Sequence, residues 1–178
     1  MSNLSVRKAI PADLDALCAF YDAVIDNMDP DQPGPKWTKG VYPTTEDLAS
    51  AVEDETFYLA FEAAGENLVG AYVLNRTDDE VYDKHPFSSG INHTDTMVVH
   101  LLAVHSQQRG KGYARAMMEA IAEEARAQGA KAVRLDILVE NTPAACLYEA
   151  CGYANEGNVT MFYEDTGWTE CTLYELVL

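Results

Sequence analysis

A short glycine-rich segment in the second half of the chain has the residue types needed to hold an anion. It reads Gln107-Gln108-Arg109-Gly110-Lys111-Gly112-Tyr113-Ala114 and lies between an expected strand and an expected helix. The first N–H groups of a helix lack intrahelical acceptors and carry about half a unit of positive charge, so they favour a bound anion. Glycines at positions 110 and 112 remove the Cβ atoms that would keep a diphosphate away from this backbone.

The local charge supports this prediction because it is opposite to that of the whole chain. The 178 residues contain 12 Lys and Arg against 29 Asp and Glu, a formal net charge of −17. Residues 105–115 nevertheless carry Arg109, Lys111 and Arg115 and no acid. A glycine-rich turn without a ligand is the alternative interpretation. The spacing fits neither the dinucleotide motif Gly-x-Gly-x-x-Gly, since position 115 is Arg, nor the P-loop.

Two segments together resemble motifs of the GNAT superfamily of acetyl-CoA-dependent N-acetyltransferases. The pattern Gln107-x-x-Gly110-x-Gly112, preceded by Leu102-Ala103-Val104-His105, resembles the acyl-CoA-binding motif of that family. Residues 141–153 match the family pattern Asn-x-x-Ala-x-x-Leu-Tyr-x-x-x-Gly-[Phe/Tyr] at every fixed position. The resemblance implies a GNAT-like α/β fold, with a mixed central β-sheet flanked by helices, and one N-acetyltransferase domain over residues 1–178.

The resemblance also implies the reaction and the binding site of its co-substrate. An acetyl group would pass from acetyl-CoA to a primary amine by direct attack in a ternary complex. The backbone of residues 109–113 would hold the CoA diphosphate, and the pantetheine arm would lie along residues 98–104, where the family's central sheet is splayed. Asn141 would contact the pantetheine or order the turn. The expected cofactor-binding residues are Leu102, Ala103, Val104, Gln107, Gln108, Arg109, Gly110, Lys111, Gly112, Tyr113, Ala114, Asn141 and Ala144.

Tyr148 is the residue expected to act on the leaving thiolate of CoA. A phenol with a pKa of about 10 can supply a proton or a hydrogen bond. The alternative is a tyrosine of the core, since Leu147 and Tyr153 also lie beside an apolar stretch. The motif around Tyr148 favours the catalytic interpretation.

The general base is less well indicated by the sequence. An alkylamine with a pKa of about 10.4 must lose a proton before it can attack. The family often places a Glu on the strand before the CoA loop, but Val98 occupies that place here. His100 lies on the same strand face and is the expected base, directly or through a water, although a buried, hydrogen-bonded histidine is the alternative. Asp95 and His93 are weaker candidates.

Two further kinds of chemistry are not predicted. Cys146 and Cys151 could suggest an acyl-cysteine intermediate, but neither has a His or Asp beside it in the sequence. The His and acidic residues show no metal-ligand spacing, so no metal is expected.

The acceptor site is expected to be built from loops that combine aromatic and acidic side chains, because such a combination suits a cation. The aromatic candidates are Trp37, Tyr42, Tyr82, Phe87 and Trp168. The acidic candidates are Asp78, Asp79, Glu80, Asp83, Glu164 and Asp165. Protein N-termini, polyamines, amino acids and aminoglycosides all fit this description.

Hydrophobic periodicity predicts the order β-α-α-β-β-β-α-β-α-β-β. Thr44 and Asp47 resemble a capping box at the start of the second helix, and residues 63–67 are expected to join two strands in a hairpin. The later elements are expected to be strand 96–104, helix 111–128, strand 131–139, helix 142–150 and strands near 157–164 and 169–177. Residues 76–93 are predicted to form a long loop.

Composition excludes several classes of protein. With 48% hydrophobic residues the chain is not expected to be disordered, and its charge argues against binding nucleic acid or an anionic membrane surface. No membrane span, signal peptide or Cys-x-x-Cys pair is recognised, which favours a reduced, cytoplasmic protein. The partner expected is a small-molecule or peptide amine, and the C-terminal strand pair could mediate a homodimer. A non-catalytic acyl-CoA-binding regulatory module and a transferase of a different acyl group are the alternatives.

Overall fold

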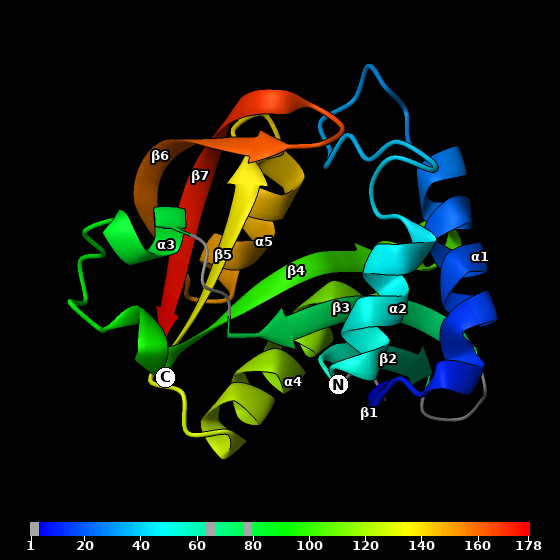
Figure 1. Ribbon diagram of the computed structural model, residues 1–178, viewed down its shortest axis with the longest axis horizontal. Helices are drawn as coiled ribbons and strands as arrows, with labels where there is room; N and C mark the ends of the chain where they lie inside the picture. The colour runs from blue at the N-terminus through cyan, green and yellow to red at the C-terminus, as the bar shows by residue number, and fades with distance from the viewer. Residues whose placement is uncertain (1–3, 63–66, 77–79) are drawn as a thin grey trace.

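The centre of the computed structural model is a seven-stranded mixed β-sheet (Figure 1). The residues described are 4–62, 67–76 and 80–178. The strands are β1 (Leu4–Lys8), β2 (Phe57–Glu62), β3 (Leu68–Asn75), β4 (Thr96–Val104), β5 (Ala132–Leu138), β6 (Ala154–Tyr163) and β7 (Gly167–Val177). Their order is β1-β2-β3-β4-β5-β7-β6, and every neighbouring pair is antiparallel except the parallel pair β4–β5. The predicted mixed sheet is therefore confirmed.

Helices cover both faces of the sheet. The helices are α1 (Leu14–Asp26), α2 (Thr45–Glu53), α3 (Glu80–Lys84), α4 (Tyr113–Ala127) and α5 (Thr142–Ala150). Helices α1 and α2 bury Leu17, Phe20 and Leu48 against β2, β3 and the end of β4. Helix α4 buries Met117 and Ile121 against the opposite face, where α5 also packs. None of the helices in the described part of the chain is long and apolar enough to cross a membrane.

The most consequential feature of the sheet is that β4 and β5 separate. They pair from Thr96 opposite Ala132 to Val98 opposite Arg134 and no further, although both strands continue. At Leu101 the backbone of β4 has a φ of 54°, and the register of β3 against β4 shifts at the same level. The Tyr21 hydroxyl of α1 donates to the carbonyl of Leu101 at 2.6 Å, so the carbonyl of the distorted residue is satisfied. The splay that the resemblance implies is present.

Two predicted elements, strand 96–104 and helix 142–150, are confirmed at both ends. The capping box is also confirmed, because Thr44 Oγ1 accepts from the N–H of Asp47 at 3.1 Å and the Asp47 carboxylate accepts from the N–H of Thr44 at 2.8 Å. Strands β2 and β3 form the expected antiparallel pair, whereas residues 63–66 of the predicted turn lie outside the described residues. The prediction of a loop over 76–93 was wrong in part, since it contains α3.

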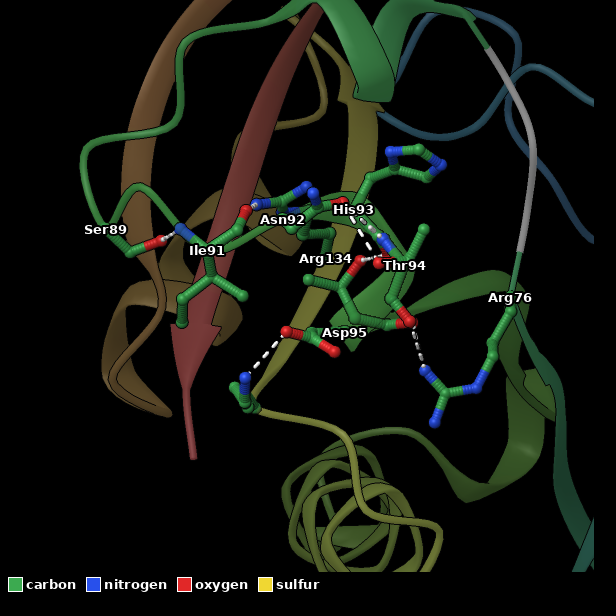
Figure 2. A network of polar contacts seen from close by, with 10 residues as sticks. Arg76, Ser89, Ile91, Asn92, His93, Thr94, Asp95 and Arg134 are labelled. Carbon is green, nitrogen blue, oxygen red and sulfur yellow. Dashed lines mark hydrogen bonds and ion pairs between the residues drawn. The ribbon is translucent and has the colours of Figure 1, made fainter.

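A buried ion pair explains why the polar segment after α3 lies on the sheet. Arg134 of β5 and Glu175 of β7 are each about 1% exposed, and the guanidinium Nε donates to the carboxylate at 2.7 Å. The same guanidinium donates to the carbonyl of Ile91 at 2.7 Å (Figure 2). It also lies 3.6 Å from the ring centroid of Phe87. A buried charge requires such partners. The segment is therefore held against β5 and β7.

Candidate active site

A pocket of about 260 Å³ lies where β4 and β5 separate. Its walls come from α1, residues 35–42, the second halves of β4 and β5, the start of α5, and the β6–β7 turn. Figure 1 shows this turn beside the loop that follows α1, and both contribute to the same pocket. Segments between residues 24 and 166 thus meet at one place in the fold.

The pocket passes from one face of the sheet to the other. Val98 and Arg134 are register partners, so His100 and Asp136, two residues further along, share their face. Tyr148 belongs to the opposite face, where it packs in the same core cluster as Val99 and Leu135. All three of His100, Asp136 and Tyr148 line the pocket. Two molecules that approach from opposite faces can therefore meet there.

The glycine-rich segment leaves a run of backbone N–H groups without acceptors among the described residues. Gly110 and Gly112 have φ values of 77° and 84°, and Gly112 precedes the first turn of α4. A Cβ at either glycine would meet nothing within 4 Å, so open space lies over this backbone. Within the described part of the chain, no atom accepts a hydrogen bond from the N–H groups of residues 110–115. These free donors fit a diphosphate.

The expected cofactor-binding residues divide into two groups. Those that line the pocket are Leu102, Ala103, Val104, Arg109, Asn141 and Ala144. Those that belong to the loop and first turn of α4, outside the pocket wall, are Gln107, Gln108, Gly110, Lys111, Gly112, Tyr113 and Ala114. Tyr113 is buried, and its hydroxyl donates to Glu62 at 2.7 Å, so it supports the loop through its side chain.

Tyr148 presents a protonated hydroxyl to the pocket. Its side chain is 6% exposed and packs against the rings of Tyr153 and Tyr174. Burial raises the pKa of Tyr148, and the negative charge of Asp136 raises it further. Among the described residues, its hydroxyl has no hydrogen-bond partner. Among the described residues of the pocket wall, it is thus a donor without an acceptor.

Asp136 is a site residue that the sequence analysis missed. One carboxylate oxygen accepts from the Tyr82 hydroxyl at 2.5 Å, and the other accepts from the Tyr163 hydroxyl. Burial raises the pKa of Tyr163, and the nearby carboxylate of Asp136 raises it further. The available signal was the alternation of two charged residues, Arg134 and Asp136, within an otherwise apolar strand.

Comparison with known proteins agrees with the fold and the site. The model of the acetyltransferase (GNAT) family matches residues 21–153. The chain belongs to the GNAT family. It is thus an N-acetyltransferase by family, and the predicted fold and the suspected resemblance are both confirmed. A search of curated proteins gave no match.

Solved structures share this fold at low sequence identity. A GNAT-family acetyltransferase from Streptococcus agalactiae superposes with a TM-score of 0.80 at 18% identity, covering 98% of this chain and 95% of that one. The yncA protein of Salmonella typhimurium, solved with its cofactor acetyl-CoA, gives 0.70 at 20% identity over 99% and 95% of the two chains. A chimera of the Vibrio cholerae spermidine N-acetyltransferase SpeG and hSSAT gives 0.69 at 17% identity over 99% and 96%.

The candidate bases of this GNAT protein differ in position. His100 lines the pocket, and its Nε2 lies 3.1 Å from Oδ1 of Asn75. Asp95 and His93 lie in the short turn directly before β4 (Figure 2). Neither residue lines the pocket. Asp95 pairs with Lys131 at 2.7 Å, and His93 pairs with Asp83 at 2.8 Å. Only His100 among these three is placed to meet an acceptor.

The predicted acceptor wall is right in part. Trp37, Tyr42 and Asp165 line the pocket. Tyr82 and Phe87 do not, because they are buried in a core cluster with Val98, and Trp168 is 76% exposed. Of the acidic candidates, Glu80 pairs with Lys84 at 2.5 Å, Asp83 pairs with His93, Glu164 is exposed, and Asp78 and Asp79 lie outside the described residues.

The cysteines do not form part of this site. Neither Cys146 nor Cys151 lines the pocket, and burial raises the pKa of the Cys151 thiol, which disfavours a thiolate nucleophile. In the residues that the structure describes, no three His, Cys, Asp or Glu side chains are grouped so as to hold a metal ion.

Proposed function

We propose that this protein transfers an acetyl group from acetyl-CoA to a primary amine by direct attack in a ternary complex. The observation that carries the proposal is the pocket through the β4–β5 splay, with Tyr148 on one face of the sheet and His100 on the other. Both substrates can occupy it together, so no covalent enzyme intermediate is required.

Acetyl-CoA would be held by backbone more than by side chains. The free N–H groups of residues 110–115 and the cations of Arg109, Lys111 and Arg115 suit the diphosphate. Leu102, Val104, Asn141 and Ala144 would line the path of the pantetheine arm. When bound, acetyl-CoA supplies the thioester whose acetyl group is transferred.

Tyr148 would act as the acid for the departing sulfur. Its raised pKa keeps the hydroxyl protonated at neutral pH, and the absence of an acceptor among the described residues leaves its proton available. A positioned donor of this kind contributes about 10²- to 10⁴-fold to a rate.

His100 would take the proton of the acceptor amine, directly or through a water. Where Asn75 Oδ1 is the acceptor, Nε2 of His100 carries the ring proton. The side chain faces the half of the pocket that contains Trp37 and Asp136. This geometry replaces the strand glutamate for which this chain has Val98.

We further propose that the reaction takes place within one domain, because residues 24–166 contribute to one pocket. A homodimer through β6 and β7 stays a prediction, which sedimentation of the purified chain would measure. Cytoplasmic location also stays a prediction.

Thermal unfolding with acetyl-CoA tests the binding step. Ligand at 100 times its Kd should add about 2.7 kcal/mol of stability, a shift of several degrees in Tm. Gly110→Glu should abolish the shift, because it places a carboxylate and a strained φ at the anion site. Gly90→Glu is the matched control, since Gly90 also has a positive φ and open space but lies outside the pocket wall. A shift retained by Gly110→Glu would contradict the assignment.

Release of CoA in the presence of an amine panel tests catalysis. Amine-dependent release is expected with acetyl-CoA. Binding of acetyl-CoA without release would support the regulatory module instead. Faster release with propionyl- or succinyl-CoA than with acetyl-CoA would identify a transferase of a different acyl group.

A further inference from the structure

The half of the pocket that contains Trp37, Asp136 and Asp165, which we call the acceptor half, carries negative charge without a matching cation. Two carboxylates, Asp136 and Asp165, contribute to the pocket wall. Among the described residues of that wall, Arg109 is the one side chain with a permanent positive charge, and it belongs to the loop that follows β4. The carboxylates belong instead to β5 and the β6–β7 turn. The charge of the pocket is therefore divided between its two ends.

Asp165 is the less fully satisfied of these two carboxylates. Its Oδ2 is buried and has no hydrogen-bond partner within the described part of the chain. Leaving a buried acceptor unpaired is costly. Burial raises the pKa of this carboxyl, and the backbone N–H groups of Asp165 and Thr166 offset the rise only in part. A ligand that brings a positive charge beside this carboxylate in the pocket would offset the cost.

The surroundings of Asp165 also suit a cation. Trp37 and Tyr42 line the same pocket and offer aromatic faces, to which ammonium groups are attracted. Burial raises the pKa of Tyr42, and the carboxylates of Asp136, Asp47 and Asp165 raise it further. The Tyr42 hydroxyl therefore stays protonated and uncharged. Its ring lies close enough to both pocket carboxylates to be affected by their charge. Asp136 is held in place by the Tyr82 and Tyr163 hydroxyls.

The acceptor half suits a positively charged group, but the nitrogen that attacks the acetyl group must be neutral. The bound cation and the reacting nitrogen are therefore different groups. A primary amine attacks only when it is neutral, whereas nearby carboxylates favour its protonated form. Two carboxylates with no cation beside them would oppose the reaction of a substrate that has one amine. They would favour a substrate that also carries a second, non-reacting ammonium group.

We infer that the acceptor is a small diamine or polyamine, whose non-reacting ammonium binds Asp165 between Trp37 and Tyr42. This inference rests on the proposed acetyl transfer and specifies its substrate class. An acceptor with a carboxylate in place of the second ammonium meets Asp136 and Asp165 as like charges and is rejected.

Three amines with the same four-carbon chain test the inference. They are 1,4-diaminobutane, butylamine and 4-aminobutanoate, which carry a second ammonium, no second charge and a carboxylate. The kcat/KM for CoA release should fall in that order, by about ten-fold or more at the first step. The KM for acetyl-CoA should be the same with each acceptor.

The variant Asp165→Asn separates recognition from chemistry. It should raise the KM for 1,4-diaminobutane by about ten-fold. It should not lower the kcat/KM for butylamine, because the variant removes a carboxylate that favours the protonated, unreactive form of that amine. Glu164→Gln removes the same charge from an exposed neighbour and is the matched control. Calorimetric titration of the diamine into the CoA complex gives a second readout that needs no turnover.

Equal kcat/KM values for the diamine and butylamine would overturn the inference and leave the proposed acetyl transfer intact. The same loss for both amines in Asp165→Asn would also overturn it. If none of the three amines reacts and calorimetry detects no diamine binding, the inference fails. The thermal shift with acetyl-CoA then decides separately whether the proposed function fails with it.

Discussion

The two halves of the pocket are built in different ways. What we call the cofactor half is the β4–β5 splay together with the glycine-rich loop just outside the pocket wall. It consists largely of backbone, with free N–H groups at the start of α4 and unpaired strand edges at the splay. The acceptor half consists of side chains brought from α1, the loop that follows it, β5 and the β6–β7 turn. Backbone geometry recurs wherever its local motif recurs, whereas side chains from four segments can each be exchanged. We therefore expect the first half to be shared across the family and the second to select the substrate.

The largest expected effect tests Tyr148, the proposed acid for the departing sulfur. Tyr148→Phe removes the hydroxyl but keeps the ring that packs on Tyr153 and Tyr174. We expect kcat to fall by about 100- to 1,000-fold, with little change in the Kd of acetyl-CoA, because only the proton donor is lost. Steady-state rates and calorimetry measure the two quantities. A fall of less than about three-fold in kcat would show that the leaving group needs no donor here.

The next effect should be confined to the acceptor half. His100→Ala should lower kcat by about ten-fold, mainly below about pH 7.5, where the smallest fraction of the amine is neutral. His100→Gln keeps a group able to bond Asn75 and controls for the support that His100 gives to β4. An unchanged pH–rate profile in His100→Ala would remove His100 from the mechanism.

The tyrosines that hold Asp136 allow a finer comparison. Tyr163→Phe and Tyr82→Phe each remove one donor to the same carboxylate, but only Tyr163 lines the pocket. Each should raise the KM of the acceptor by about three- to ten-fold, because the carboxylate loses an orienting hydrogen bond. Neither should change the Kd of acetyl-CoA. A change in acetyl-CoA binding would show that the two halves are not separable in this way.

The last prediction is that kcat does not fall at high pH. Burial raises the pKa of Tyr148 above its ordinary value of about 10, so the hydroxyl stays protonated as the pH rises. The kcat should hold between about pH 8 and pH 10. A decline over that range that Tyr148→Phe abolishes would contradict the assignment of a raised pKa.

The same contrast explains what could be predicted from the sequence. The glycine-rich loop and the segment from Asn141 to Tyr153 are local motifs, so their fold and their place at the pocket followed from residues adjacent in the chain. The positions of α5 and β4 followed from apolar periodicity and a stop signal such as Gly152.

The acceptor half was harder to predict because long-range contacts decide it. Tyr82 and Phe87 lie among polar residues and suggested a loop, but the buried pair of Arg134 and Glu175 holds this segment on the sheet. Asp136 was overlooked because its role depends on two tyrosines that are 27 and 54 positions away in the chain. No local pattern contains that information.

Initial rates with both substrates varied test the central claim most directly. If the two substrates meet in the pocket through the splay, double-reciprocal plots at several fixed acceptor concentrations should intersect. Parallel lines, with exchange of labelled CoA into acetyl-CoA when no amine is present, would indicate an acetylated enzyme and contradict direct transfer.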